Sequence, residues 1–447
     1  MKLMADLRFR RIGTACVAAL FVSACGIFSG GNDGDAIDRT GRVDMVLAEQ
    51  KIEADPDMAA VAVILPEPRL NTSWPQSGSR ATKEVGHVQA GVGLKRAWKI
   101  NAGKGTSTRS ALSVPPVTDE NAVFVLDADQ TLRSFDIETG RRNWQYEIKS
   151  GSKRDKRSLG GGLAIDGSHI YVASGFGLLQ KLNTEDGSMV WSRDLSAPMT
   201  GSPTVKDGRV YATSQNNEIF AFNAEDGATL WSDQAIAETA KVLGSPSPAA
   251  IEDILVAPFS SGEVVAYLSS NGRRLWSDAL SRTGRFTPIS SINDVTARPV
   301  LARGFAFAAS QSGLLVAIDG RTGNRIWVKP IGSTQAPALA GEFLFVSGID
   351  GKIVCFTARS GGVVWATQLP AFENEKKKKG RISYAGPLIA SNRVIVISTE
   401  GDLVALSPQT GEVLDTVDLK SSVYIEPIAA KGKILVLTDD GELIALE

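Results

Sequence analysis

Residues 225–231, EDGATLW, decide the fold, because the spacing of their glycine and tryptophan recurs along the chain. Gly227 precedes Trp231 by four residues, and this spacing occurs six times. The pairs are Gly140 with Trp144, Gly187 with Trp191, Gly227 with Trp231, Gly272 with Trp276, Gly323 with Trp327 and Gly361 with Trp365. A seventh copy, beginning at Thr410, carries Asp415 in the tryptophan position. A period of roughly 45 residues indicates repeated supersecondary units.

Each repeat also contains a hairpin and a shorter strand before it. The hairpin consists of an apolar run, a polar turn and a second apolar run, as in VYATSQNNEIFAFN from Val210. Eight such hairpins begin near residues 123, 170, 210, 254, 305, 343, 394 and 434. Proline opens most of the preceding strands, which is a position where strands tolerate it. Nearly continuous apolar runs indicate burial on both faces. Four antiparallel strands per repeat predict the blade of a β-propeller.

The strand count predicts how the propeller closes. Eight hairpins are followed by seven complete fourth strands, because the chain ends at Glu447 within the eighth hairpin. The segment GLKRAWKI, residues 93–100, matches a fourth strand and follows no hairpin. Pairing it with the last blade removes an open sheet edge. We therefore predict an all-β fold, an eight-bladed β-propeller of four-stranded antiparallel blades whose last blade is closed by the N-terminal strand. Seven blades are the alternative if one repeat is misassigned.

We interpret seven of the eight tryptophans as structural side chains. Each would lie on the outermost strand of a blade, where the wedge between radiating blades is widest and a large flat ring fills it. The glycine before each tryptophan permits a left-handed backbone in the preceding turn. The seven are Trp98, Trp144, Trp191, Trp231, Trp276, Trp327 and Trp365; Trp74 lies outside the register.

The first 70 residues predict export and a tether. Residues 1–24 combine a basic start with an apolar run too short to span a bilayer as a helix, followed by VSAC. This pattern resembles a bacterial lipoprotein signal peptide, which predicts lipidation of Cys25; an ordinary signal peptide with a chance cysteine is the alternative. Gly26, rather than aspartate, favours delivery to the outer membrane. Residues 25–70 are expected to be a lipidated tether and residues 71–447 the propeller. The apolar stretch 59–65 could be an extra strand on the propeller.

The rest of the sequence gives no indication of an enzymatic, metal-binding or nucleic-acid-binding site. A net charge of −1 gives no indication of nucleic-acid binding. After processing, Cys355 is the remaining thiol and is expected in the core. The two histidines have no partner spacing, and the glycines at 160–162 fit an inner strand better than a phosphate loop. We predict no catalytic, cofactor-binding or metal-binding residues. Two basic stretches, residues 149–157 and the loop containing Lys376–Lys379, are interpreted as solvated loops, with acidic lipid or an acidic partner as alternatives.

The repeat motif resembles two families. The sequences DIETGRRNW from Asp136 and DGRTGNRIW from Asp319 are similar to the tryptophan-docking repeat of pyrroloquinoline-quinone dehydrogenases, which have eight blades. The adjacent cysteine pair of those enzymes is absent, so the enzymatic resemblance fails. The lipoprotein signal, the tether and a single propeller, with NTSWPQSG at residues 71–78 and DVTARPV at 294–300, resemble the BamB family of the outer-membrane β-barrel assembly (BAM) machinery.

This second resemblance implies a function. It implies a non-catalytic scaffold, lipid-anchored at the periplasmic face of the outer membrane. Its expected partners are the POTRA domains of BamA, other BAM lipoproteins and unfolded outer-membrane protein clients. The family's partner-binding loops correspond to Val242, Leu243 and Asp294 here, although Leu243 replaces an arginine of the family pattern and Thr296 replaces an aspartate. A PQQ-like envelope binding or sensor module and a quinoprotein dehydrogenase are the alternatives.

Overall fold

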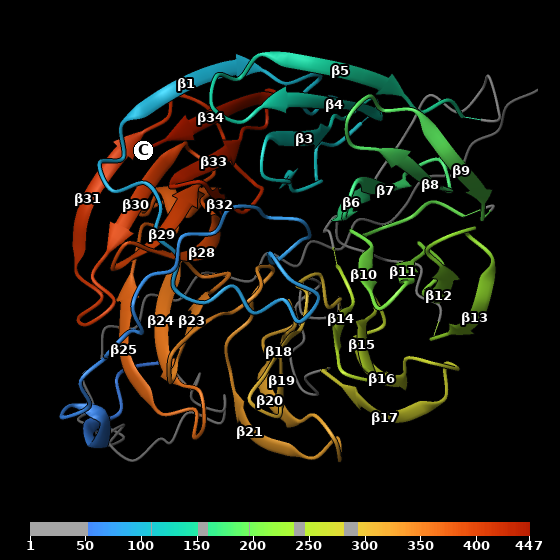
Figure 1. Cartoon of the computed structure of the whole chain (residues 1–447). Helices are drawn as coiled ribbons and strands as arrows, with labels where there is room; N and C mark the ends of the chain where they lie inside the picture. The colour runs from blue at the N-terminus through green and yellow to red at the C-terminus, as the bar shows by residue number, and fades with distance from the viewer. Residues whose placement is uncertain (1–51, 109, 151–159, 196, 237–245, 281–293) are drawn as a thin grey trace, which may run out of the picture. The chain divides into compact units, whose positions relative to one another are not determined.

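Eight four-stranded antiparallel sheets radiate around a central axis (Figure 1). The computed structural model describes residues 52–108, 110–150, 160–195, 197–236, 246–280 and 294–447. In this part of the chain each sheet is formed by the predicted short inner strand, hairpin and outer strand. The prediction of an all-β, eight-bladed propeller is therefore confirmed.

The first four blades follow one another along the chain. Blade 1 contains β2 (Val117–Thr118), β3 (Ala122–Leu126), β4 (Thr131–Asp136) and β5 (Arg142–Glu147). Blade 2 contains β6 (Gly161–Asp166), β7 (His169–Ser174), β8 (Leu178–Asn183) and β9 (Met189–Asp194). Blade 3 contains β10 (Thr204–Lys206), β11 (Arg209–Thr213), β12 (Glu218–Asn223) and β13 (Thr229–Gln234). Blade 4 contains β14 (Ala249–Ile251), β15 (Ile254–Pro258), β16 (Glu263–Leu268) and β17 (Arg274–Ala279).

The next three blades keep this order, and a small hairpin separates the last two of them. Blade 5 contains β18 (Val300–Ala302), β19 (Phe305–Ala309), β20 (Leu315–Asp319) and β21 (Arg325–Lys329). Blade 6 contains β22 (Ala338–Ala340), β23 (Phe343–Ser347), β24 (Lys352–Thr357) and β25 (Val363–Gln368). The small hairpin is β26 (Phe372–Asn374) with β27 (Lys379–Arg381). Blade 7 contains β28 (Tyr384–Ala390), β29 (Arg393–Ser398), β30 (Asp402–Leu406) and β31 (Val413–Asp418).

Blade 8 combines the first strand of the described chain with the last three. Its strands are β32 (Ile428–Ala430), β33 (Lys433–Leu437), β34 (Glu442–Leu446) and β1 (Arg96–Asn101). Strand β1 pairs antiparallel with β34, with Lys99 opposite Ile444. The N-terminal strand therefore supplies the outer strand of the last blade, as the strand count predicted.

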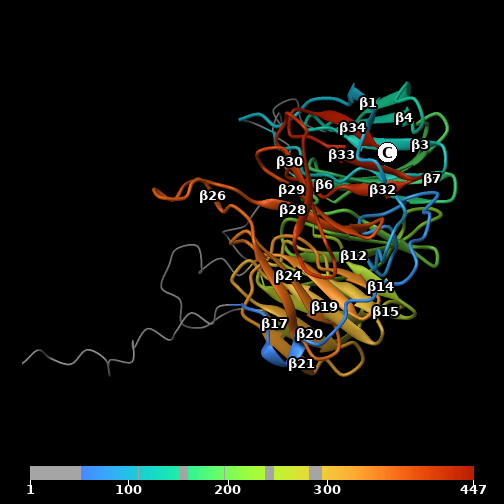
Figure 2. The same cartoon turned by 90° about the vertical axis from the view of Figure 1, so that its left-hand side faces the viewer.

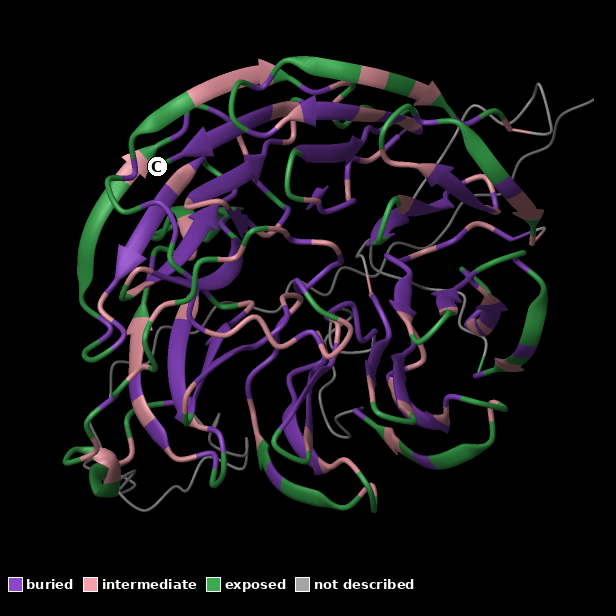
Figure 3. Ribbon diagram, viewed as in Figure 1, coloured by how far each residue is buried: buried purple, intermediate pink, exposed green. Residues whose placement is uncertain are grey.

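Burial falls from the inner strands to the outer ones (Figure 3). In blade 4, every residue of β15 after the first is buried, whereas β17 buries only Trp276. The continuous apolar runs thus belong to strands covered by neighbouring blades on both faces. Within the described residues, no helix is long and apolar enough to cross a membrane; the helix found there is the 3-10 turn η1 (Pro56–Met58).

Each repeat tryptophan packs onto the next blade rather than onto its own turn. The glycine beneath Trp231 is Gly272 of blade 4, which has φ +75°, and a Cβ there would lie 2.6 Å from the indole ring. The indole Nε1–H also donates to a backbone carbonyl oxygen of the next blade, at 2.8–3.3 Å. The pairs are Trp98 to Ile137, Trp144 to Thr184, Trp191 to Ala224, Trp231 to Ser269, Trp276 to Gly320, Trp327 to Ala358 and Trp365 to Pro408.

A β-bulge sets the direction of each tryptophan. In blade 3, Trp231 lies opposite Ala221 while Thr229 lies opposite Phe222, so Leu230 is the extra residue. Leu230 is exposed, whereas Trp231 is buried. A bulge increases local twist and re-aims a side chain, which here points the ring at the neighbouring blade. Glycine is therefore needed at this position for two reasons: the backbone is left-handed, and the tryptophan ring of the preceding blade leaves no room for a side chain.

The sequence did not indicate how residues 69–91, the crossing segment, are used. They cross the end of the central channel and form hydrogen bonds with the first strand, or the turn that follows it, of every blade except blade 6. The backbone contacts join Trp74 with Thr118, Pro75 with Ile165, Ala81 with Ala250, Thr82 with Leu301, Val88 with Ile389 and Ser391, and Asn71 and Gly91 with Lys431 and Gly432. The Gln76 side chain reaches blade 3, donating to Val205 O and accepting from Val205 N. The crossing segment covers this end of the channel.

Residues 52–66, the outer segment, differ from the expected tether. Asp55 forms backbone and side-chain hydrogen bonds with Val363 of blade 6, and Val63 is buried between blades 6 and 7. His87 holds this segment in place, because its ring contacts Pro66 O through Nδ1 and accepts from Asn392 N through Nε2. The expected tether ending at residue 70 is thus too long at its C-terminal end. The apolar stretch 59–65 packs on the propeller, but forms no regular strand.

Candidate docking face and central channel

The two faces of the propeller carry different features (Figure 2). The loops that connect the fourth strand of one blade to the first strand of the next lie on one face, which we call the docking face. The crossing segment contacts the opposite ends of the first strands. In Figure 2, strand β26 projects from the left of the disc, whereas the blue crossing segment lies towards the right. A ligand or partner segment can therefore approach the channel from the docking face.

The channel contains a cavity of about 380 Å³. Its wall is formed by the loops that lead into blades 1, 5, 6, 7 and 8, and Ser77 of the crossing segment contributes to it. Apolar and aromatic side chains, such as Leu112, Tyr384 and Tyr424, alternate with polar ones such as Gln335. A mixed lining of this kind suits a small organic molecule or a short peptide segment.

An ion pair spans the channel. Arg298, from the loop before blade 5, pairs with Glu426, from the loop before blade 8. Their side chains are only 10% and 12% exposed. The pair lies directly against the crossing segment, since a Cβ on Gly78 would be 2.6 Å from Arg298 Nε. The salt bridge therefore links two distant loops above the covered end of the channel.

Lys83 of the crossing segment is buried beside this pair. Its Nζ has no hydrogen-bond partner among the described residues. Burial holds the pKa of Lys83 well below its ordinary value; the nearby Arg298 guanidinium lowers it further and the Glu426 carboxylate opposes both. Arg298 Nε, Ser77 Oγ and Thr296 Oγ1 also lack a partner within the described part of the chain. Within the described ranges, four unpartnered polar atoms thus gather at the floor of the channel.

The three residues expected to contact a partner are only partly described. Val242 and Leu243 lie outside the described residues. Asp294 lies in the loop before blade 5, but it is 3% exposed and its backbone carbonyl accepts a hydrogen bond from Gln311 N. A side chain that contacts a partner is expected to be exposed, and the burial of Asp294 differs from that expectation. Strand β14 of blade 4 and strand β18 of blade 5 are in contact, so these two blades are neighbours.

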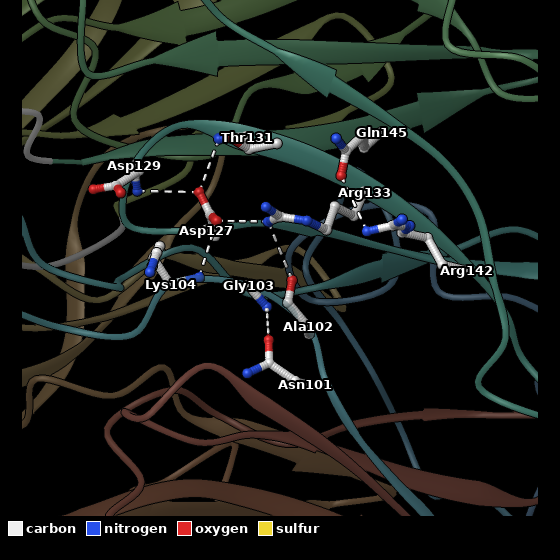
Figure 4. Close-up of polar contacts among 10 residues, drawn as sticks. All are labelled: Asn101, Ala102, Gly103, Lys104, Asp127, Asp129, Thr131, Arg133, Arg142 and Gln145. Atoms are coloured by element: carbon white, nitrogen blue, oxygen red, sulfur yellow. Dashed lines mark hydrogen bonds and ion pairs between the residues drawn. The ribbon is translucent and has the colours of Figure 1, made fainter.

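The buried carboxylate of Asp127 stabilises the fold through hydrogen bonds (Figure 4). It is 2% exposed and lies in the hairpin turn of blade 1. Its oxygens accept hydrogen bonds from the backbone N–H groups of Asp129, Thr131 and Lys104, and from Arg133 Nη1 at 2.5 Å. Lys104 follows β1, so this carboxylate fastens the loop after blade 8 to blade 1.

Other chemistry-bearing side chains also stabilise the fold. Asp136 and Asp319 accept hydrogen bonds from Thr139 and Thr322 in their turns, and these bonds lower the pKa of each carboxyl group. Cys355 is a free, fully buried thiol opposite Trp365, and burial raises its pKa. The glycines at 160–162 lead into β6, an inner strand, as predicted. Among the described residues, no group of three or more His, Cys, Asp or Glu side chains could hold a metal ion.

Sequence reasoning missed Lys83, Arg298 and Glu426. Lys83 lies in the non-repeated crossing segment. Arg298 and Glu426 each directly precede the proline before the first strand of a blade, and their contact joins residues 128 positions apart. No spacing pattern marks such a pair. A lysine between the apolar Trp74 and Val88 in a non-repeated segment was the only available indication.

A family model described as "Outer membrane protein assembly factor BamB" matches residues 95–154, 149–367 and 350–447. The chain belongs to the BamB family. Curated relatives in this family include the outer membrane protein assembly factor BamB of Yersinia pestis, 25% identical over 242 residues, covering 53% of this chain and 61% of the relative. BamB of Escherichia coli (strain K12) is 27% identical over 240 residues, with coverages of 53% and 61%. The chain thus spans about three fifths of the length of these relatives.

Solved structures support the fold. The crystal structure of BamB from Moraxella catarrhalis superposes with a TM-score of 0.62 at 18% identity, covering 78% of this chain and 96% of that one. A quinohemoprotein alcohol dehydrogenase from Comamonas testosteroni superposes with a TM-score of 0.64 at 14% identity, covering 84% and 80%. At these identities the two likenesses concern the fold alone, so the family model rather than the superposition distinguishes BamB from the dehydrogenases.

Proposed function

We propose that this BamB-family chain is a non-catalytic scaffold of the machinery that assembles β-barrel proteins in the outer membrane. In this proposal Cys25 carries a lipid that holds the protein at the periplasmic face. The docking face binds the POTRA domains of BamA, with contributions from other BAM lipoproteins, and aids folding and insertion of client barrels.

The family match along residues 95–447 carries the proposal, because its model and the curated relatives are named as assembly factors. The structure adds a physical argument. Residues far apart in the chain are held on a rigid disc, in which blades 4 and 5 are neighbours. Loops displayed on a rigid scaffold are the usual place for partner recognition.

A second candidate is small-molecule binding in the channel, by a PQQ-like envelope module or a quinoprotein dehydrogenase. The cavity of about 380 Å³ favours it. Calorimetry with pyrroloquinoline quinone and calcium distinguishes the two. The scaffold proposal expects no stoichiometric binding and no dye reduction with alcohols, and binding at one quinone per chain would favour the enzyme.

The partner surface is tested by Leu243→Glu, followed by co-purification with BamA from detergent-solubilised outer membranes and mass spectrometry. We expect BamA to be lost from the purified complex while the melting curve stays unchanged. The matched control is Leu230→Glu on the exposed rim of blade 3, where Leu230 is 47% exposed; this variant should retain BamA. Asp294→Asn is preferable to a charge reversal, because Asp294 is buried. Normal BamA recovery with Leu243→Glu would place the contact elsewhere.

The lipid anchor is tested separately. Cys25→Ser should abolish labelling with palmitate and release the mature chain from the outer membrane. Labelling that persists in this variant would contradict lipidation at Cys25 without bearing on the BamA contact.

A further inference from the structure

The hairpin β26–β27 is the most strongly charged feature that the fold and the proposed scaffold role leave unused. Four consecutive lysines, Lys376–Lys379, occupy its tip, and all four are exposed. The chain as a whole has a net charge of −1, so this cluster is a local exception. Figure 2 shows the hairpin projecting beyond the disc on the docking face.

The base of the hairpin is firmly held. Arg381 donates to Ile349 O of blade 6 at 2.6 Å, and its guanidinium lies 5.4 Å from the centre of the Phe372 ring. Ile382, buried between blades 6 and 7, donates its N–H to Ala371 O. These contacts fix the direction in which the tip projects.

The hairpin contains two acidic residues, Glu373 and Glu375, and the one directly before the lysines is used by the hairpin itself. Glu375 accepts hydrogen bonds from the backbone N–H groups of Ala371 and Phe372, at 2.8 and 3.1 Å. None of the four lysine ammonium groups forms an ion pair with a carboxylate within the described ranges. Four like charges repel each other unless anions lie nearby. The hairpin therefore presents concentrated positive charge that the described fold does not neutralise.

We propose that the tip of this hairpin binds the headgroups of anionic phospholipids and so orients the propeller on a membrane surface. Lysine is depleted in protein–protein interfaces, where aromatic residues and arginine dominate. Each lysine near an anionic membrane surface contributes about 1 kcal/mol of attraction, so a cluster of four is large enough to hold a protein on anionic lipid. The tip contains no aromatic or apolar side chain between the lysines, so it offers charge without a shaped surface.

The position of the N-terminal segment agrees with this assignment. Ile52, the first described residue, packs among side chains of blades 5 and 6, and its carbonyl accepts a hydrogen bond from Lys352 Nζ. The hairpin begins directly after β25 of blade 6. The 26 residues between Cys25 and Ile52 could reach at most roughly 90 Å when extended. A lipid at Cys25 alone would therefore not fix how the propeller is oriented on the membrane. Binding of the charged hairpin to lipid would fix that orientation. The inference does not depend on BamA binding.

The test uses the full chain carrying Cys25→Ser, so that no lipid contributes, with Lys376–Lys379 all replaced by Gln. Sedimentation with phosphatidylcholine vesicles, with and without phosphatidylglycerol, isolates the charge-dependent increment in binding. We expect the parent chain to gain affinity when phosphatidylglycerol is added, and to lose that gain at about 1 M salt, where screening extends only about 3 Å. The increase in vesicle affinity caused by phosphatidylglycerol should be smaller by roughly 100-fold or more in the glutamine variant than in the parent chain.

Two further variants control the test. Replacing Arg141, Arg273, Arg321 and Arg359 by Gln removes the same charge from exposed turns at the opposite face, and should leave the increment nearly intact. Replacing Lys376–Lys379 by Arg keeps the charge and should retain binding. An unchanged increment in the glutamine variant, or an equal loss in the opposite-face control, would overturn the proposal. Binding of the parent to poly-glutamate but not to the anionic vesicles would assign the hairpin to an acidic protein instead.

Discussion

The seam between blades 3 and 4 differs from the seam between blades 7 and 8. At the first, Trp231 rests on Gly272 and donates a hydrogen bond to Ser269 O. At the second, Asp415 occupies the tryptophan position and is exposed. Blade 8 has no glycine turn between its third and fourth strands, because its fourth strand is β1. Part of the crossing segment lies there instead. Val88 bonds to Ile389 and Ser391 of blade 7, and Gly91 bonds to Gly432 of blade 8.

The comparison separates two ways of joining blades. Seven seams use a local, repeated contact at the rim, whereas the eighth uses a non-repeated segment near the axis. Val88 and Ala90 belong to the same buried cluster as the strands of blades 7, 8 and 1. Breaking a rim contact should therefore weaken one seam, but breaking the crossing segment should affect the closure of the whole ring.

The largest effect is expected from removing residues 52–92 while retaining β1. This deletion exposes the apolar surface around Trp74 and Val88, each 1% exposed, and we expect a loss of more than about 5 kcal/mol in unfolding free energy. Urea denaturation followed by circular dichroism measures it. A shorter deletion that removes only residues 52–66 should cost much less. Equal stability of the longer deletion and the parent would show that the crossing segment is dispensable.

A rim seam is tested by a double-mutant cycle. Trp231→Ala should cost about 3–5 kcal/mol. Gly272→Ala places a Cβ 2.6 Å from the indole ring, and should cost about 1–3 kcal/mol beyond the backbone strain. Gly208→Ala is the control, because Gly208 has φ +70° but no atom within 4 Å of the added Cβ; it should cost about 1 kcal/mol.

The double-mutant cycle tests whether the indole ring of Trp231 is what a side chain at position 272 would meet. In the Trp231→Ala background, Gly272→Ala should cost no more than the Gly208 control, because the ring that it meets is gone. Additive free energies would mean that the glycine is needed for its backbone conformation alone.

The next prediction concerns Lys83, the buried lysine of the crossing segment. Lys83→Met replaces a buried, unpartnered amino group by an apolar chain of similar length, and should stabilise the protein by about 1–3 kcal/mol near neutral pH. Because the folded-state pKa of Lys83 is lowered, the unfolded chain binds more protons below the ordinary value of 10.5. The parent should therefore gain stability as pH rises towards 10.5, and the advantage of Lys83→Met should shrink. Denaturation at pH 7 and pH 10 measures both; an advantage that is independent of pH would contradict burial of the charge.

The smallest effect is expected at the exceptional seam. Asp415→Trp restores the repeat residue, but no docking glycine lies beneath it, so stability should change by no more than about 0.5 kcal/mol. Thermal unfolding provides the measurement, with Trp365→Phe as a comparison at an intact seam. A clear gain from Asp415→Trp would mean that the indole can dock without the glycine turn.

The candidate site was less predictable from sequence than the fold. The loop before blade 5 was indicated by the resemblance to the BamB family, which pointed to Asp294. The burial of Asp294 and the channel-spanning pair of Arg298 and Glu426 could not be predicted, because both depend on tertiary contacts that the repeat spacing does not specify. The sequence also contained no indication that the segment around Lys376–Lys379 forms a regular hairpin, because its two short strands are polar.

The sequence by itself determined the blade, the number of blades and the closure by β1. These features recur or can be counted, and their physical cause is local: alternating turns, buried strands and a Gly-x-x-x-Trp spacing. Tertiary structure alone decided which glycine each tryptophan meets, that residues 52–70 pack on the propeller, and that residues 69–91 cross its channel. The contacts of Val88 with Ile389 and of Gly91 with Gly432 join residues about 300 or more positions apart. Such contacts leave no periodic trace, because each is made once, where the ring of blades has to close.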